Sequence, residues 1–256
     1  IDKFILQGKD QVPNAALPSF WETIEKKYDK FVNLSESVEG ALLAIPGRSG
    51  HLWPHNLRHS MLNRNYAEFA NDLAEIPQEF NQRFYPTDEE KLWAQKERKA
   101  IGGKIILWSL AGSAIHKTWP YLDTILARLM IETDVKVVLV GDVLCQLLEQ
   151  GWEKEPRVFC KSGIWTIRES LSFARVADSV IGSETGVLNA VGMEEVEKIV
   201  MLSHSSVENL TKHWKNTQSL ERHAEPNAHR RAGRRSCSAS SSSSSSASRL
   251  TVRGFG

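Results

Sequence analysis

An alternation of apolar runs and amphipathic stretches after Lys104 constrains the fold of this chain more than any other feature. The run Ile105–Leu110 contains no charged side chain, which is typical of a strand that is covered on both faces. Pro120 then suits the first turn of a helix, and apolar residues follow it at helical spacing. The pattern continues to Leu202 and predicts further strands at 135–140, 158–160, 179–181 and 198–202, and helices at 144–150, 167–174 and 187–191.

Strands that alternate with helices predict a parallel sheet with right-handed crossovers. We therefore expect an α/β fold, with a doubly wound parallel sheet over residues 103–222. Sheets of this kind bind ligands at the carboxyl ends of their strands. Because polar or glycine-rich clusters follow the expected strands, we predict a ligand site at that edge of the sheet. These clusters are Gly112-Ser113, Gly141-Asp142, Gly182–Gly186 and Ser203–Ser206.

The N-terminal part, residues 1–102, has an α/β pattern of lower regularity. Thr87 followed three residues later by Glu90 is a helix-start pattern, and this helix should run to about Ala100. Gly102-Gly103 then interrupts the chain, and we place a domain boundary there. Other elements expected in this part are strands at 2–6 and 30–34 and helices at 18–27 and 59–74.

The charge of the chain is unevenly distributed. The formal charge of the 256 residues is +1, but six arginines and no acidic residue lie after Pro226, so residues 1–226 carry −5. A mildly acidic body offers no broad basic surface, and we expect no nucleic-acid partner. The end of the chain, 223–256, holds an unbroken serine run at Ser240–Ser246 and should be disordered. It is either a basic arm that contacts nucleic acid or a membrane, or a non-native end, and we favour the second interpretation.

Three cysteines, none of them in a CxxC pair, predict neither a disulfide framework nor a thiolate metal site. They fit a reducing, cytoplasmic compartment. No stretch approaches the roughly 18 apolar residues that span a bilayer. The chain begins with Ile1 and lacks a signal-peptide pattern, so we expect the true N-terminus to lie upstream. Three histidines recur at every fourth position, at His51, His55 and His59. Because Pro54 lies among them and no cluster of acidic residues accompanies them, we expect no metal site there.

The loop after the first expected strand suits an anion. Gly112 lets the backbone approach a phosphate, Ser113 and Thr118 can donate hydrogen bonds, and Lys117 supplies a positive charge. The helix that follows begins with backbone N–H groups that favour anions. The spacing does not match a Walker A loop. An ordinary strand-to-helix loop with a solvated lysine explains this segment equally well.

The loop after the fourth expected strand also joins a strand end to a helix start. Thr185 and the amides of Gly186 and Val187 could hold a phosphate, and Glu184 could bind sugar hydroxyls. The alternative is a turn in which Thr185 caps the helix and Glu184 is favoured by the helix dipole. That alternative accounts less well for the glycines on both sides, at 182 and 186.

Other strand-end residues are secondary candidates. Asp142, Ser203 and His204 each follow an expected strand, but no Ser–His–acid spacing indicates a hydrolase triad. Trp119 and Trp165 lie near loops and could stack on a base, whereas Trp108 lies within a buried strand and is expected in the core. These three tryptophans stand at 108, 119 and 165.

Taken in order, these segments resemble the C-terminal half of glycosyltransferase family 9, the ADP-heptose:lipopolysaccharide heptosyltransferases. Lys117-Thr118-Trp119-Pro120 is similar to the family's K-x-W-P segment. Ser183–Ala190 is similar to its D-[ST]-G-x-x-H-x-A signature, and both Val137–Gly141 and Leu171–Asp178 resemble stretches between the two. The resemblance covers about residues 104–202.

The resemblance implies two facing Rossmann-like domains of the GT-B type, the N-terminal one incomplete here. The nucleotide-sugar donor would lie mainly on the C-terminal domain and a glycan or lipid-linked acceptor on the N-terminal one, near a membrane. Transfer would be inverting and would need no metal or cofactor. The reaction would belong to lipopolysaccharide biosynthesis. The donor-binding residues would be Gly112, Ser113, Lys117, Thr118, Glu184, Thr185, Gly186 and Asn189.

The chain departs from the family pattern at two signature positions. Glu184 replaces the usual aspartate and adds a methylene, and Asn189 replaces the usual histidine and removes a possible cation. The family's catalytic base is an acid in an early N-terminal loop, which we expect to lie upstream of this chain; Glu36 and Glu39 stand in as candidates. These departures keep open a module that binds the donor without turnover. A Rossmann-type oxidoreductase or epimerase is disfavoured because no G-x-G-x-x-G follows a strand.

Overall fold

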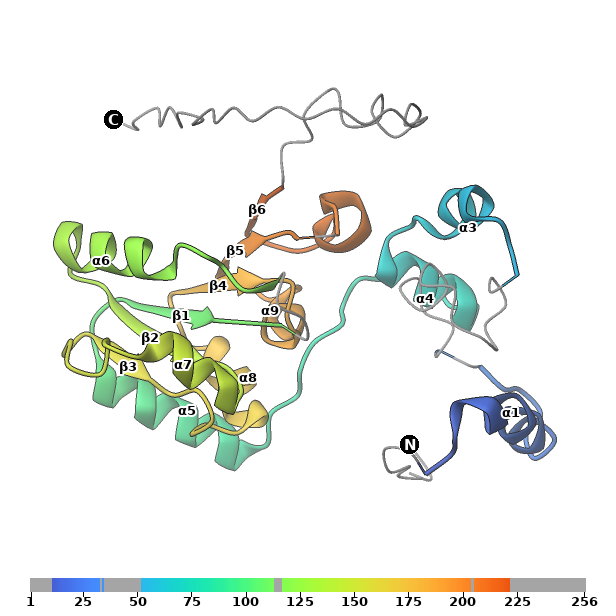
Figure 1. Ribbon diagram of the computed structural model, residues 1–256. Coiled ribbons are helices and arrows are strands. Elements are labelled where there is room, and N and C mark those ends of the chain that lie inside the picture. The colour runs from blue at the N-terminus through green and yellow to red at the C-terminus, as the bar shows by residue number, and fades with distance from the viewer. Residues whose placement is uncertain (1–10, 33, 35–51, 113–116, 204, 222–256) are drawn as a thin grey trace, which may run out of the picture. The chain divides into compact units, whose positions relative to one another are not determined.

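The computed structural model describes residues 11–32, 34, 52–112, 117–203 and 205–221. Its centre is a six-stranded sheet in the order β3-β2-β1-β4-β5-β6 (Figure 1), in which every pair of neighbours is parallel. The α/β class and the parallel sheet are therefore confirmed. The strands are β1 (Ile105–Ser109), β2 (Lys136–Val140), β3 (Val158–Cys160), β4 (Ser179–Ser183), β5 (Glu197–Met201) and β6 (Thr217–Leu220).

The strand order reverses next to β1. From β1 the chain proceeds outward through β2 and β3, and it then returns to place β4 against the other side of β1. Leu107 of β1 pairs with Val138 on one side and with Val180 on the other. The loops that follow β1 and β4 thus leave the sheet toward opposite faces, and the gap between them is the topological switch point where such sheets bind ligands.

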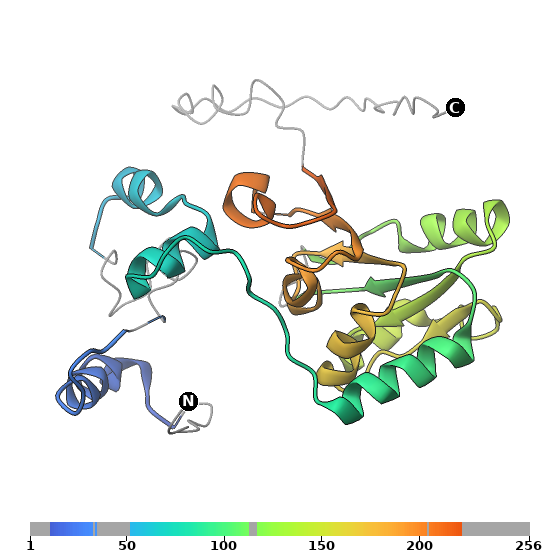
Figure 2. The same ribbon diagram turned by 180° about the vertical axis from the view of Figure 1, so that it is seen from behind.

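Helices cover both faces of the sheet, as a doubly wound fold requires. One core layer packs α5, α8 and α9 against Leu107, Val138 and Val180, and the other packs α6 and α7 against Trp108 and Leu139. Figures 1 and 2 show α5 and α6 on opposite sides of the sheet. Trp108 is 1% exposed, so its expected place in the core is confirmed. The helices are α5 (Asp88–Ile101), α6 (Leu122–Glu132), α7 (Gln146–Glu149), α8 (Ile167–Ala174) and α9 (Gly186–Val191).

The start of α5 follows directly from its sequence. The Thr87 hydroxyl accepts from the Glu90 N–H at 3.3 Å, and the Glu90 carboxylate accepts from the Thr87 N–H at 2.7 Å. This reciprocal capping box is the one that the sequence predicts. Although α5 precedes Gly102-Gly103, it packs against α8 and the sheet. The boundary at these glycines stays a prediction.

The described residues before α5 form helices, and two expectations fail there. The single helix expected at 59–74 is two, because Asn65 interrupts it and its side chain accepts from the Ala67 and Glu68 amides at the start of the second. Residues 30–32 and 34 form no strand, and the strand expected at 2–6 lies outside the described residues. The helices of this part are α1 (Leu17–Glu25), α3 (His55–Leu62) and α4 (Tyr66–Ala74).

The sequence pattern also misses the edge strand β6. Its residues Thr217-Gln218-Ser219-Leu220 alternate between half-buried and exposed and are mostly polar. An edge strand has one unpaired side and little core contact, so it leaves only a weak apolar signal. Over the described residues, no helix is long and apolar enough to cross a membrane.

A fully buried lysine lies on β5. Lys198 is 0% exposed, and its ammonium donates to the carbonyls of Glu194 at 2.8 Å and Val196 at 2.6 Å. Burial is the main cause that lowers the pKa of Lys198 from 10.5 to about 8. Between these two values the unfolded chain binds the proton that the folded chain has lost, so this group makes stability rise with pH.

We therefore expect the free energy of unfolding of the wild type, relative to a Lys198→Met variant, to increase by about 2–3 kcal/mol between pH 8 and 10.5. Urea denaturation of both proteins at several pH values in this window measures the difference. Comparison with the variant cancels the titration of all other groups. Parallel pH profiles would show that Lys198 is not desolvated in the folded protein.

Candidate functional site

A cavity of about 600 Å³ lies at the switch point, where β1, β2 and β4 end. We call it the switch-point cavity. Four different loops contribute to its wall, so the fold itself converges on this place. Residues that line it include Ser109, Gly112, Lys117, Asp142, Trp165, Glu184, Thr185, Gly186 and Asn189.

Thr185 connects the two strands of the switch point. Its hydroxyl lies 3.1 Å from the hydroxyl of Ser109 at the end of β1, and both residues are buried. Thr185 occupies the N-cap position of α9, but its side chain makes no capping hydrogen bond. The Thr185 hydroxyl is turned toward β1 and does not cap the helix, contrary to the alternative interpretation of this loop.

Lys117 rests on the glycine of the first loop. A Cβ atom on Gly112 would lie 2.5 Å from Cδ and 3.0 Å from Cβ of Lys117, so a side chain at position 112 would displace this lysine stem. The Ser183 hydroxyl donates to the Lys117 carbonyl and ties the loop to the end of β4. Among the described residues, no acidic side chain or carbonyl pairs with the Lys117 ammonium. The geometry thus provides a positioned stem that carries an available cation.

Glu184 is held by a residue of the next strand end. It is 6% exposed, and its carboxylate accepts from the Ser203 N–H at 2.8 Å and from the Ser203 hydroxyl at 2.5 Å. Hydrogen bonds to an ionised acceptor are the stronger kind. The additional methylene of glutamate, compared with aspartate, lets the carboxylate reach Ser203 at the end of β5.

Two further predicted residues line the switch-point cavity with their polar groups already engaged. The Asn189 amide donates to the Thr185 carbonyl at 3.0 Å, one turn back in α9. Asp142 caps the short helix after β2, where its carboxylate accepts from the amides of Leu144 and Cys145. Both residues are exposed, so each retains a surface that a ligand could contact.

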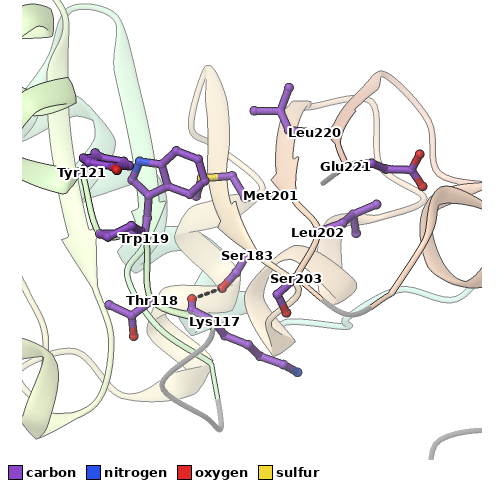
Figure 3. A pocket seen from close by; sticks show the side chains of 11 residues that line it. Lys117, Thr118, Trp119, Tyr121, Ser183, Met201, Leu202, Ser203, Leu220 and Glu221 are labelled. Carbon is purple, nitrogen blue, oxygen red and sulfur yellow. Dashed lines mark hydrogen bonds between the residues drawn. The ribbon is translucent and has the colours of Figure 1, made fainter. Parts of the chain in front are cut away.

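A second cavity, of about 420 Å³, lies beside the first at the ends of β5 and β6 (Figure 3). We call it the Trp119 pocket. Lys117 lines both cavities, and Ser203 lines this one while binding Glu184 of the other. Thr118 and Trp119 lie here, which separates them from most of the predicted site. The wall consists of residues 117–121, Ser183, residues 201–203, Leu220 and Glu221.

The structure also adds residues that the sequence pattern did not single out. These are Ser109 and Ser170, which line the switch-point cavity. Trp165, which the sequence offered as a stacking residue, lines it as well, and its ring also packs on Trp93 and Phe173. Gly163, with a φ of +66°, makes the turn that leads from β3 toward Trp165. A positive φ favours glycine, so Gly163 was the sequence signal for a tight turn before Trp165.

Four predicted residues lie outside the described part of the chain, namely Ser113, His204, Glu36 and Glu39. Within the described part, no three histidine, cysteine or acidic side chains gather as a metal site would require.

Comparisons with known proteins give matches of structure rather than of sequence. No family model and no curated protein matches the sequence. A glycosyl transferase family 9 protein from Veillonella parvula DSM 2008 superposes with a TM-score of 0.52 and 14% identity, over 66% of this chain and 53% of that one. The E. coli ADP-heptose lps heptosyltransferase II superposes with a TM-score of 0.53 and 17% identity, over 79% of this chain and 71% of that one.

This chain spans about half of the Veillonella protein. At these identities the likeness concerns the fold alone. The resemblance that the K-x-W-P segment and the signature loop suggest is confirmed at this level: the chain has the fold of glycosyltransferase family 9 and of a heptosyltransferase.

Proposed function

We propose that this chain is the donor-binding part of a glycosyltransferase that uses a nucleoside diphosphate sugar. The switch-point cavity carries this proposal, because Lys117, Glu184 and Thr185 all line it at the place where open α/β sheets bind nucleotides. Its volume of about 600 Å³ is in the range of cofactor sites. The fold shared with two glycosyltransferases supports the same class.

The diphosphate would lie against Lys117 and Gly112. The ammonium supplies a compact positive charge, and Gly112 leaves the space that the stem of this lysine fills. Gly186, which is exposed at the start of α9, offers a close approach to the backbone. Because these groups can compensate the charge of the leaving diphosphate, we propose that the reaction needs no divalent cation.

The finer assignment rests on the resemblance and on the neighbours' names. We propose an ADP-heptose-like donor, a glycan or lipopolysaccharide-type acceptor bound by the acceptor-side part in residues 1–102, and a cytoplasmic location. In an inverting transfer, a base removes the proton of the acceptor hydroxyl, whose oxygen bonds to the anomeric carbon while the bond to the diphosphate breaks. Glu36 and Glu39 stay candidates for that base.

Calorimetric titration of the full chain with ADP, UDP and GDP tests the proposal. We expect one of the three to bind, and we expect Lys117→Ala to weaken it about tenfold, since one charge-assisted contact contributes about 1.5 kcal/mol or more. Lys96→Ala is the matched control, because Lys96 is exposed on α5 and lines neither cavity. No binding of any diphosphate, or equal binding by the Lys117 variant, would contradict the proposal.

The binding-only alternative gives a different result. The Asn189 amide, which is bonded to the Thr185 carbonyl, offers no cation where the family signature has histidine. If a nucleotide sugar binds but is neither transferred nor slowly hydrolysed, even with the upstream sequence restored, the chain is a binding module. Measurable turnover would exclude that alternative.

A further inference from the structure

The start of α4 makes contacts with the C-terminal part of the chain that the candidate site does not use. They involve η4 (Val207–Thr211), a π-helical turn between β5 and β6. The Asn65 amide donates to the Glu208 carbonyl at 3.0 Å, and the Asn209 amide donates to the Arg64 carbonyl at 3.1 Å. Amides and carbonyls do not titrate, so these two contacts are independent of pH.

A charged cluster lies one turn further along α4. The Glu68 carboxylate lies 2.7 Å from Nε2 of His213 and 3.1 Å from Nζ of Lys212. The ring of Phe80 stacks on the imidazole of His213, with centroids 3.6 Å apart and an angle of 6° between the planes. The imidazole therefore faces a carboxylate from α4, an aromatic ring from the segment after α4, and an ammonium from its own segment. We call Glu68, Phe80, Lys212 and His213 the His213 cluster.

Both partners that come from the first hundred residues favour the protonated form of His213. A carboxylate accepts a charge-assisted hydrogen bond from an imidazolium, whereas a neutral imidazole offers at most an ordinary one. The face of an aromatic ring also attracts a cation. Lys212 repels the imidazolium, but its ammonium is shared between Glu68 and Glu208.

The carboxylate of the cluster is ionised wherever histidines titrate. The hydrogen bonds from His213 and then from Lys212 hold the pKa of Glu68 below its usual value of 4.5. Histidines change charge between about pH 5 and 8. Within that range the charge of the imidazole is therefore the part of the cluster that changes.

The cluster joins two segments that have consequences for the candidate site. Residues 76–87, which connect α4 to α5, contain no helix or strand, so side-chain contacts rather than a continuous element attach α4 to the C-terminal part. On the other side, η4 connects β5, after which Ser203 binds Glu184, to β6, whose Leu220 lines the Trp119 pocket.

We propose that the His213 cluster is a pH-sensitive attachment of α4 to the segment after η4, strong while His213 is protonated and weaker as the pH rises through the range of histidine. At high pH the amide hydrogen bonds and the ion pair of Lys212 with Glu68 remain, and α4 opens more often. The inference goes beyond the proposed function, because it does not depend on which ligand the switch-point cavity binds.

Hydrogen–deuterium exchange of the α4 amides in the full chain tests this inference. The measured quantity is the ratio of exchange rates between a His213→Gln variant and the wild type at the same pH, which cancels the effect of pH on the exchange chemistry. Glutamine keeps a hydrogen-bonding side chain but cannot take up a proton. We expect a ratio of about five at pH 6, the size of one good ion pair, and below about two at pH 8.

Two further variants control the experiment. His59→Gln should give a ratio near one at both pH values, because His59 is exposed on α3 and stacks on His55 instead of on this cluster. In a Glu68→Gln background, the ratio for His213→Gln should no longer depend on pH, because glutamine carries no charge.

Three results would overturn the inference. Equal ratios at pH 6 and pH 8, or a larger ratio at pH 8, would show that the charge of His213 does not strengthen the attachment. PH dependence that persists in the Glu68→Gln background would assign it to another group. Exchange in β1 that accelerates by the same factor as in α4 would show global rather than local opening.

Discussion

Replacing Glu184 with methionine is expected to lower the free energy of unfolding by about 2–3 kcal/mol, since hydrogen bonds to charged groups contribute about 1.5–3 kcal/mol. Methionine approximates the shape of glutamate but cannot accept the two hydrogen bonds that Ser203 donates at 2.8 and 2.5 Å. Glu184 is 6% exposed, so water replaces the lost acceptor poorly. Urea denaturation measures the loss, and a change below about 0.5 kcal/mol would show that the pair does not hold the ends of β4 and β5 together.

Glu184→Gln is the matched variant. The glutamine carbonyl can accept from the Ser203 N–H, and its amide can donate to the Ser203 oxygen once that hydroxyl turns, so most of the stability should return. The glutamine variant thus separates the hydrogen bonds from the charge. If it is as unstable as the methionine variant, the charge of the carboxylate is the essential part. If it is stable, its affinity for a nucleotide sugar reports what the charge contributes to the ligand.

The sheet was predictable because its signals are local. A strand that is covered on both faces must be largely apolar, as Ile105–Trp108 of β1 and Val137–Val140 of β2 are. The capping box of Thr87 and Glu90 needs only four consecutive residues. The elements that the sequence pattern missed lack such local signals. The polar edge strand β6 lacks an apolar run, and the break between α3 and α4 depends on one asparagine whose side chain caps the second helix.

The location of the site was predictable from topology, but its pairings were not. Strand-end clusters after β1 and β4 meet because parallel strands end at one edge of the sheet, so Lys117 and Glu184 line one cavity. The sequence contains no sign that Glu184 binds Ser203, 19 positions away, because this contact depends on the register of β4 against β5. For the same reason the sequence could not place Trp119 in a different cavity from Trp165.

Replacing Gly182 with alanine is expected to lower the free energy of unfolding by about 3 kcal/mol, at the upper end of ordinary overpacking costs. A Cβ atom at this position would lie 2.7 Å from the backbone oxygen of Ser109 and 3.1 Å from its Cβ. The obstacle is the backbone of β1, to which β4 is hydrogen-bonded, so neither side can move without disrupting the sheet. Thermal and urea denaturation measure the effect, and a stability within about 0.5 kcal/mol of the wild type would contradict the close approach of β4 to β1.

Gly186→Ala, four residues away, should behave in the opposite way. A Cβ atom there meets nothing within 4 Å, and the residue begins α9, so stability should stay the same or rise by up to about 1 kcal/mol. Yet Gly186 lines the switch-point cavity, and a methyl group would occupy the space that we assign to the diphosphate. We therefore expect a stable protein that binds the diphosphate several-fold more weakly, measured by the same calorimetric titration. The sheet thus requires glycine at position 182, and the proposed ligand requires it at position 186. If a Gly186 variant binds the diphosphate normally, the diphosphate does not lie against α9, and Lys117 and Gly112 remain its proposed contacts.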